Sequence, residues 1–118
     1  MFRFEQLEIW QASMALCERV YRLSQSFPVA EQYGITSQVR RSALSISANI
    51  AEGAGRSTDG DFARFIDIAF GSLMETVSHL TLAKRLQYLD DATHQEAYEA
   101  CESIGRMLTS FRNRLRKP

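Results

Sequence analysis

The chain has 118 residues, a length that accommodates one domain with a hydrophobic core of its own. Apolar residues make up 45% of the sequence and charged residues 24%, which is typical of a folded protein and excludes intrinsic disorder. Fourteen basic residues balance fourteen acidic ones, so the chain carries no overall charge that would attract nucleic acid or an anionic membrane.

Turn residues divide the chain into four amphipathic segments, and no run alternates as a half-buried strand does. Pro28 ends the first segment, the glycines Gly53 and Gly55 end the second, and the pair Asp90 and Asp91 ends the third. Within one domain, residues 1–118, the expected helices span about 4–27, 36–55, 59–89 and 92–116.

The connections between these segments are short and polar. The stretch RSTDGD offers Ser57, Thr58 or Asp59 as N-cap of the third helix, and Asp91 or Thr93 can cap the fourth. Four amphipathic helices joined by short turns predict an all-α fold, an antiparallel up-down-up-down four-helix bundle.

Two stripes run side by side along the second expected helix. The apolar stripe consists of Val39, Ala43, Ile46, Ile50 and Gly53, and the polar stripe of Gln38, Ser42, Ser45, Asn49, Glu52 and Arg56. On the third helix Ser72, Glu75 and His79 follow one another at similar spacing. Polar residues at this spacing favour an interhelical network that fixes the register of two helices, or of two subunits, over an acid–base site. The expected members of this structural or interfacial network are Gln38, Arg41, Ser45, Asn49, Glu52, Ser72 and Glu75.

A further face of the second helix lacks the Lys and Glu residues of a solvated surface. It carries Leu44, Ala48 and Ala51 instead. A helix without a charged outer side is typical of self-association, and we expect these three residues at an oligomer interface. The alternative is an Ala- and Ser-rich helix that is simply exposed.

The sequence does not contain the residue patterns of the catalytic and metal-binding sites that we considered. A di-iron bundle needs Glu-x-x-His motifs on two helices, but Glu75 and His79 are four residues apart and the chain has only two histidines. Cys17 and Cys101 lie near opposite ends and outside any ligand-spaced cluster. A disulfide between them is conceivable, but we expect two buried thiols. The sequence therefore predicts a protein that is not an enzyme and has no metal or cofactor.

The C-terminal residues are the strongest candidates for contact with nucleic acid. After Arg106 the chain has no acidic residue, and a local basic patch can bind phosphates whatever the net charge. The alternative is that these cations complement the dipole at the end of the last helix. The candidate nucleic-acid contacts are Arg112, Arg114, Arg116 and Lys117.

The first ten residues, MFRFEQLEIW, lack the uninterrupted apolar run of a signal peptide. The sequence also has no run of about eighteen apolar residues that could span a bilayer. We therefore expect a cytoplasmic protein that makes no contact with membranes.

Three stretches carry a resemblance to a known family: FEQLEIWQ, FPVAEQYGITSQVRRSALSISANIAEGAGR and DFARFIDIAFGSLMETVSHLTLAKRLQYL. They resemble the bacterial 23S rRNA intervening-sequence proteins. The resemblance implies an up-down four-helix bundle that assembles as a cyclic homopentamer. It transfers no catalytic role to the recurrent polar and glycine positions, which we interpret as structural or interfacial. The chain is more distantly similar to the accessory variability determinant of diversity-generating retroelements, a basic bundle that works with RNA, from which its balanced charge departs.

Sequence and resemblance together favour one function over a second. The favoured function is a non-enzymatic, self-assembling interaction or scaffold module whose partner is a second copy of itself. The alternative is an accessory protein that binds RNA, or an RNA-associated protein, through basic patches on the oligomer.

Overall fold

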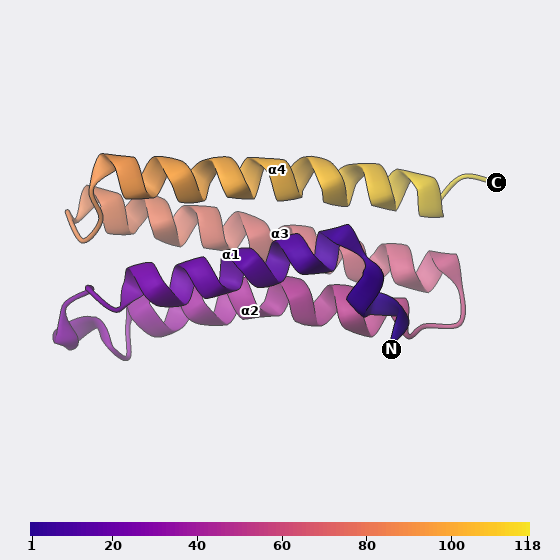
Figure 1. Cartoon of the computed structure of the whole chain (residues 1–118), viewed down its shortest axis with the longest axis horizontal. Coiled ribbons are helices and arrows are strands. Elements are labelled where there is room, and N and C mark those ends of the chain that lie inside the picture. Colours follow the sequence, from indigo (N-terminus) through magenta and orange to yellow (C-terminus); the bar gives the residue numbers. More distant parts are fainter.

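The computed structural model describes all residues, 1–118, and contains four long helices and no strand. The helices are α1 (Glu8–Ser24), α2 (Ile35–Ala54), α3 (Asp59–Arg85) and α4 (Asp91–Leu115), with short 3-10 helices η1 (Arg3–Gln6) and η2 (Val29–Glu31). They lie side by side in a body of 47 × 22 × 21 Å (Figure 1). The prediction of an all-α chain with four helices is confirmed.

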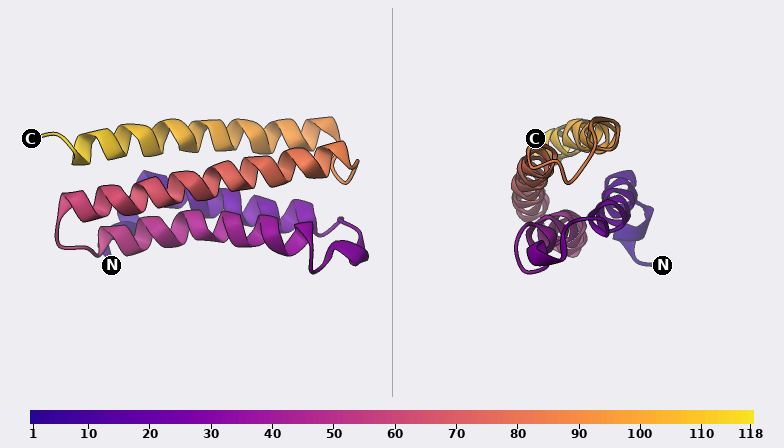
Figure 2. Two further views of the ribbon diagram at one scale, coloured as in Figure 1. Left: turned by 180° about the vertical axis from the view of Figure 1, so that it is seen from behind. Right: turned by 90° about the vertical axis from the view of Figure 1, so that its left-hand side faces the viewer.

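Each helix packs against two neighbours, in the order α1, α2, α3, α4 and back to α1. An end-on view shows the four helices around a common centre (Figure 2). The α1–α2 and α3–α4 connections lie at one end of the molecule, and the α2–α3 connection lies at the other end with both termini (Figure 1). The contact between α2 and α3 is the most extensive in the fold.

The core lies between the helices and receives the apolar stripe of each one. Val20 from α1, Ile50 from α2, Leu73 from α3 and Leu108 from α4 have no exposed surface. Burying one such side chain stabilises the fold by about 1.5–3 kcal/mol, so these spacings determine which side of each helix faces inward.

The first helix is shorter than the expected range of 4–27. Leu7 has an extended backbone (φ −79°, ψ 126°) that separates η1 from α1. The ring of Phe4 then meets Trp10 edge-on, with 5.0 Å between centroids. At its other end α1 stops at Ser24, before Pro28, which prevents the helix from continuing through the connection.

The third helix ends at Arg85, earlier than the expected residue 89. Gln87 adopts a left-handed backbone conformation (φ 65°), and the amide of Tyr88 donates to the carbonyl oxygen of Ala83 at 2.9 Å. A left-handed residue closed by such a bond is a common helix terminator, and here a glutamine occupies the position in place of glycine. The acidic pair at 90 and 91 therefore does not end α3.

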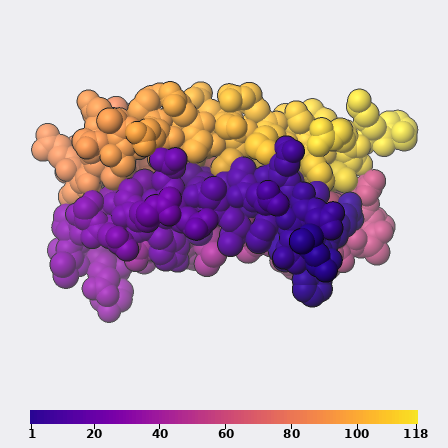
Figure 3. Space-filling view, viewed as in Figure 1, coloured from indigo at the N-terminus to yellow at the C-terminus, as the bar shows by residue number.

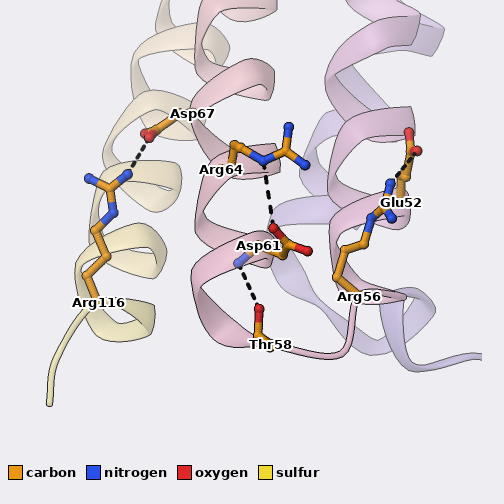
Figure 4. A network of polar contacts seen from close by, with 7 residues as sticks. All are labelled: Glu52, Arg56, Thr58, Asp61, Arg64, Asp67 and Arg116. Atoms are coloured by element: carbon orange, nitrogen blue, oxygen red, sulfur yellow. Dashed lines mark hydrogen bonds and ion pairs between the residues drawn. The ribbon is translucent and has the colours of Figure 1, made fainter.

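The caps follow the expected chemistry at one helix and differ at the next. Thr58 caps α3, because its Oγ1 accepts from the amide of Asp61 at 3.1 Å (Figure 4). The N-cap of α4 is Asp90, whose carboxylate accepts from the amide of Thr93 at 2.7 Å. This bond lowers the pKa of Asp90. Asp91 is already the first residue of the helix, so neither it nor Thr93 is the cap.

Candidate functional site

Hydroxyl groups from α2 and α3 meet in the contact between these two helices. The Oγ atoms of Ser45 and Ser72 are 2.9 Å apart. Thr76 Oγ1 lies 2.9 Å from Ser42 Oγ and 2.9 Å from the carbonyl oxygen of Ser72. Asn49 Nδ2 donates to the carbonyl oxygen and to Oγ of Ser45, at 2.8 and 3.0 Å. The structure thus brings together three of the expected network residues, Ser45, Asn49 and Ser72.

Two members of this network are absent from the set expected from the sequence. Ser42 is 5% exposed, and Thr76 is fully buried. Ser42 lies on the polar stripe, three residues before Ser45, and this spacing could have predicted its place in the network. Thr76 follows Ser72 by four residues but has the position of an apolar core residue, so its pattern alone gave no polar signal.

A cavity of about 130 Å³ opens beside these hydroxyl groups, between α2 and α3. Every residue that lines it is polar: Gln38, Arg41, Ser42, Ser45, Ser72 and Glu75. Arg41 and Glu75 form no ion pair within the chain, and both are exposed. The expected network is therefore a buried row of hydroxyl groups with two unpaired charges of opposite sign at its outer edge.

Glu52, the remaining expected member, lies apart from the hydroxyl groups. Its carboxylate pairs with Arg56 one turn later on α2, at 3.2 Å (Figure 4). Both side chains are about half exposed, so this is a surface ion pair within one helix. It does not join α2 to α3.

Gly53 explains how closely α2 approaches α3. A Cβ atom at this position would lie 2.7 Å from Cβ of Phe65 and 2.8 Å from Cδ1 of Phe62. Both distances are shorter than real Cβ contacts, so only glycine fits without a shift of the helices. The glycine belongs to the packing of the apolar stripe and does more than end the helix.

The outward surface of α2 and α3 carries apolar side chains. Leu44 is 50% exposed, Ala48 is exposed and Ala51 is partly exposed. On the neighbouring helix Ile68 and Leu82 are 42% and 47% exposed. We call these five residues the outer α2–α3 face. It is accessible within a single chain.

The expected nucleic-acid contacts fall into two groups. Arg116 pairs with Asp67 of α3 at 2.6 Å (Figure 4). Arg112 pairs with the same carboxylate at 3.2 Å, so both arginines tie the end of α4 to its neighbour. Arg114 extends over the ring of Phe111, 5.5 Å from its centroid, and forms no ion pair. Lys117 forms no ion pair either. Two of the four expected nucleic-acid contacts, Arg112 and Arg116, therefore form ion pairs within the fold.

Reactive side chains are dispersed or buried. No group of three or more His, Cys, Asp and Glu residues is placed to hold a metal ion. Cys17 and Cys101 are free and buried, and burial raises the pKa of Cys101 to about 11. A thiol with such a pKa stays protonated near neutral pH and is a poor nucleophile.

Comparisons with known proteins identify a family and a similar solved structure. Residues 5–110 match the family described as 23S rRNA-intervening sequence protein. A crystal structure from Bacteroides thetaiotaomicron, described as a protein with unknown function from the S23 ribosomal protein family, is similar with a TM-score of 0.79 and 28% sequence identity. The similarity covers 86% of this chain and 95% of that one.

No curated protein matches the chain. None of the four helices combines the length and apolarity needed to cross a membrane.

Proposed function

The chain belongs to the 23S rRNA-intervening sequence protein family, and we propose that it is a non-enzymatic scaffold that assembles with copies of itself. In this proposal an antiparallel up-down-up-down bundle forms a cyclic homo-oligomer, a pentamer, in the cytoplasm. One observation carries the proposal. The outward surface of α2 presents Leu44, Ala48 and Ala51 where a monomer would present charge.

Small side chains on this surface favour helix-to-helix contact between subunits. Ala48 and Ala51 allow a neighbouring backbone to approach closely, and Leu44 supplies apolar area for burial. Ile68 and Leu82 are further exposed apolar side chains on α3. A ring requires a heterologous contact that closes, so this face would meet a different surface of the next subunit.

The unpaired charges beside the outer α2–α3 face support the same proposal. Arg41 and Glu75 lie at the rim of the polar cavity and have no partner within their own chain. A neighbouring subunit can supply both partners, and complementary charges at the rim of an interface select register and orientation. The hydroxyl row beneath them holds α2 in place and has no catalytic part in this proposal.

Light scattering on the purified protein tests the assembly directly. We expect an oligomer at micromolar concentration, and Ala48→Arg or Ala51→Arg to convert it to smaller species with unchanged helical circular dichroism. Ala15→Arg is the matched control, because it places the same side chain on an exposed position of α1. A wild-type protein that is monomeric at this concentration would contradict the proposal. Equal disruption of the oligomer by all three variants would contradict it as well.

RNA binding is the second candidate, and one observation favours it. Arg114 and Lys117 are free of ion pairs, whereas Arg112 and Arg116 hold Asp67. An oligomer would repeat the two free cations once per subunit. The proposed distant relationship to the accessory variability determinant of diversity-generating retroelements supports this candidate, while the zero net charge weighs against it.

A gel-shift titration with a transcript of a 23S rRNA helix at several salt concentrations tests RNA binding. We expect affinity that falls with salt, and a weaker, less salt-dependent interaction for the double variant Arg114→Gln/Lys117→Gln. The control is Arg22→Gln/Arg85→Gln, which removes two exposed cations elsewhere on the chain. Absence of RNA retention at low salt would exclude this candidate and leave the assembly proposal standing.

A further inference from the structure

A second cavity, of about 530 Å³, lies between the start of α1 and the C-terminal half of α4. Its lining includes Gln6 and Glu8 from the N-terminal segment and Arg106, Ser110 and Arg114 from α4. Figure 3 shows these two parts of the chain side by side on the surface of the molecule. The cavity is formed by α1 and α4, so it lies away from the outer α2–α3 face.

The lining of the cavity carries positive charges that have no ion-pair partner within the chain. Neither Arg106 nor Arg114 forms an ion pair, and Glu8 is the only acidic residue in the lining. The first turn of α1 contains Glu8, whose charge opposes the positive end of the helix dipole, so the two guanidinium groups supply the excess positive charge of the lining. An anion bound in the cavity would compensate part of this excess positive charge.

The rest of the lining is apolar. Met107 and Phe111 lie beside the arginines on α4, and the Phe111 ring packs on Phe62 at 5.1 Å between centroids, which fixes it in place. The Arg114 guanidinium extends over the same Phe111 ring. An aromatic ring and a guanidinium plane are the groups on which a nucleic-acid base stacks.

We propose that this cavity binds a nucleotide, with its phosphate between Arg106 and Arg114 and its base against Phe111 and Met107. A phosphate monoester carries a charge of about −1.5 to −2 at neutral pH, which matches two unpaired arginines better than a carboxylate does. The volume lies within the range of about 300–1,000 Å³ that small-molecule sites have. The site is complete within one chain, so it goes beyond the assembly proposed above and does not depend on it.

Isothermal titration calorimetry on the full chain tests the proposal with three probes: adenosine 5′-monophosphate, inorganic phosphate and adenosine. We expect the nucleotide to bind more tightly than phosphate, because only the nucleotide uses the aromatic surface, and adenosine to bind most weakly. No binding of the nucleotide at millimolar concentration would overturn the proposal. Equal affinities for nucleotide and phosphate would overturn it as well, because the base would then make no contact.

Variants locate the site. Arg106→Gln/Arg114→Gln should weaken nucleotide binding at least about tenfold, since two charge-assisted contacts are lost. Glu8→Gln should strengthen it about twofold to fivefold, because it removes a like charge from the lining. Arg22→Gln/Arg85→Gln is the control and should bind as the wild type does. Equal losses in the two double variants would show nonspecific attraction and refute a site in this cavity.

A competition arm separates the two sources of such a ligand. A short oligoribonucleotide with a 5′-phosphate that displaces the bound nucleotide would support the end of an RNA strand as occupant. Failure to displace it would support a free nucleotide. In both cases we expect the phosphate at Arg106 and Arg114, and light scattering on the same variants should show an unchanged assembly.

Discussion

The hydroxyl oxygens of Ser45 and Ser72 lie 2.9 Å apart and join α2 to α3 near the middle of both helices. Ser72 is 8% exposed, so this bond forms largely away from water. A buried polar contact holds two helices at one register, because a shift along the axis would break the Ser45–Ser72 bond and leave Ser45 with only its partner on the same helix, Asn49. The most extensive helix pair of the bundle is thus positioned by hydrogen bonds as well as by packing.

Replacing Ser72 with alanine tests this contact. We expect the free energy of unfolding to fall by about 0.5–1.5 kcal/mol, the usual net value of a hydrogen bond within a protein. Urea denaturation followed by circular dichroism measures it at matched protein concentration. Ser78→Ala is the control, because Ser78 is exposed on the same helix. Equal effects of the two substitutions would contradict a role for the Ser45–Ser72 bond.

Gly53→Ala should destabilise the bundle although alanine is the better helix former. The added Cβ would come within 2.7 Å of Cβ of Phe65, and α2 would have to move away from α3. Overpacking of this kind costs about 1–3 kcal/mol. Gly60→Ala has no heavy atom within 4 Å of the new Cβ and should be neutral or slightly stabilising. Thermal unfolding of both variants decides the matter, and a Gly53→Ala protein as stable as the wild type would refute the close approach.

His94 should make stability depend on pH at the α3–α4 connection. Burial lowers the pKa of His94 below its usual value, and the nearby Lys84 adds to the shift while Asp91 opposes it. The unfolded chain therefore binds the proton more readily than the folded one. The stability contribution is complete above about pH 6.5 and is lost as the pH falls through the lower pKa of the folded state.

Thermal unfolding of the wild type and of His94→Gln, between pH 7.5 and 5, measures this contribution. The wild type should lose more of its Tm than the variant over this range. A proton NMR titration of the folded wild type should place the His94 pKa below 6.5. Parallel losses of Tm in the two proteins would show that His94 does not cause the pH dependence.

Asp67 should anchor the C-terminal end of α4, because it binds both Arg112 and Arg116. Asp67→Asn should lower the free energy of unfolding by about 0.5–1 kcal/mol at low salt and by less at high salt, as expected for partly exposed ion pairs. Glu96→Gln removes a single, more exposed pair with Arg19 and should have the smaller effect. Chemical denaturation at two salt concentrations measures both, and a larger effect at Glu96 would count against the anchor.

Several features of the fold follow from particular residues. The spacing of Val39, Ala43, Ile46 and Ile50 predicts which side of α2 is buried, and all four are fully buried. The end of α3 could not be predicted in the same way. Gln87 takes the left-handed conformation usually reserved for glycine, and the bond that closes this turn depends on where Tyr88 packs.

The polar residues divide in the same manner. The spacing of Ser45 and Ser72 along their helices indicated an interhelical network, and the two side chains do meet. The sequence did not indicate which residue pairs with Glu52. In the structure Glu52 pairs with Arg56, because the two lie one turn apart on an exposed surface of the same helix. The sequence alone indicates no partner for Arg112 and Arg116. In the fold both arginines bind Asp67, which is 45 residues from Arg112 and 49 residues from Arg116 in the sequence.

The sequence by itself determined four amphipathic helices, their inward faces and the small and apolar residues on the outer side of α2, because these depend on residue spacing along one helix. Only the tertiary structure decided which polar groups are paired. A hydroxyl, carboxylate or guanidinium group accepts many partners, and the packing of distant segments selects among them. The same packing left Arg41 and Glu75 unpaired beside the outer α2–α3 face and Arg106 and Arg114 unpaired in the α1–α4 cavity. Binding is proposed at both places.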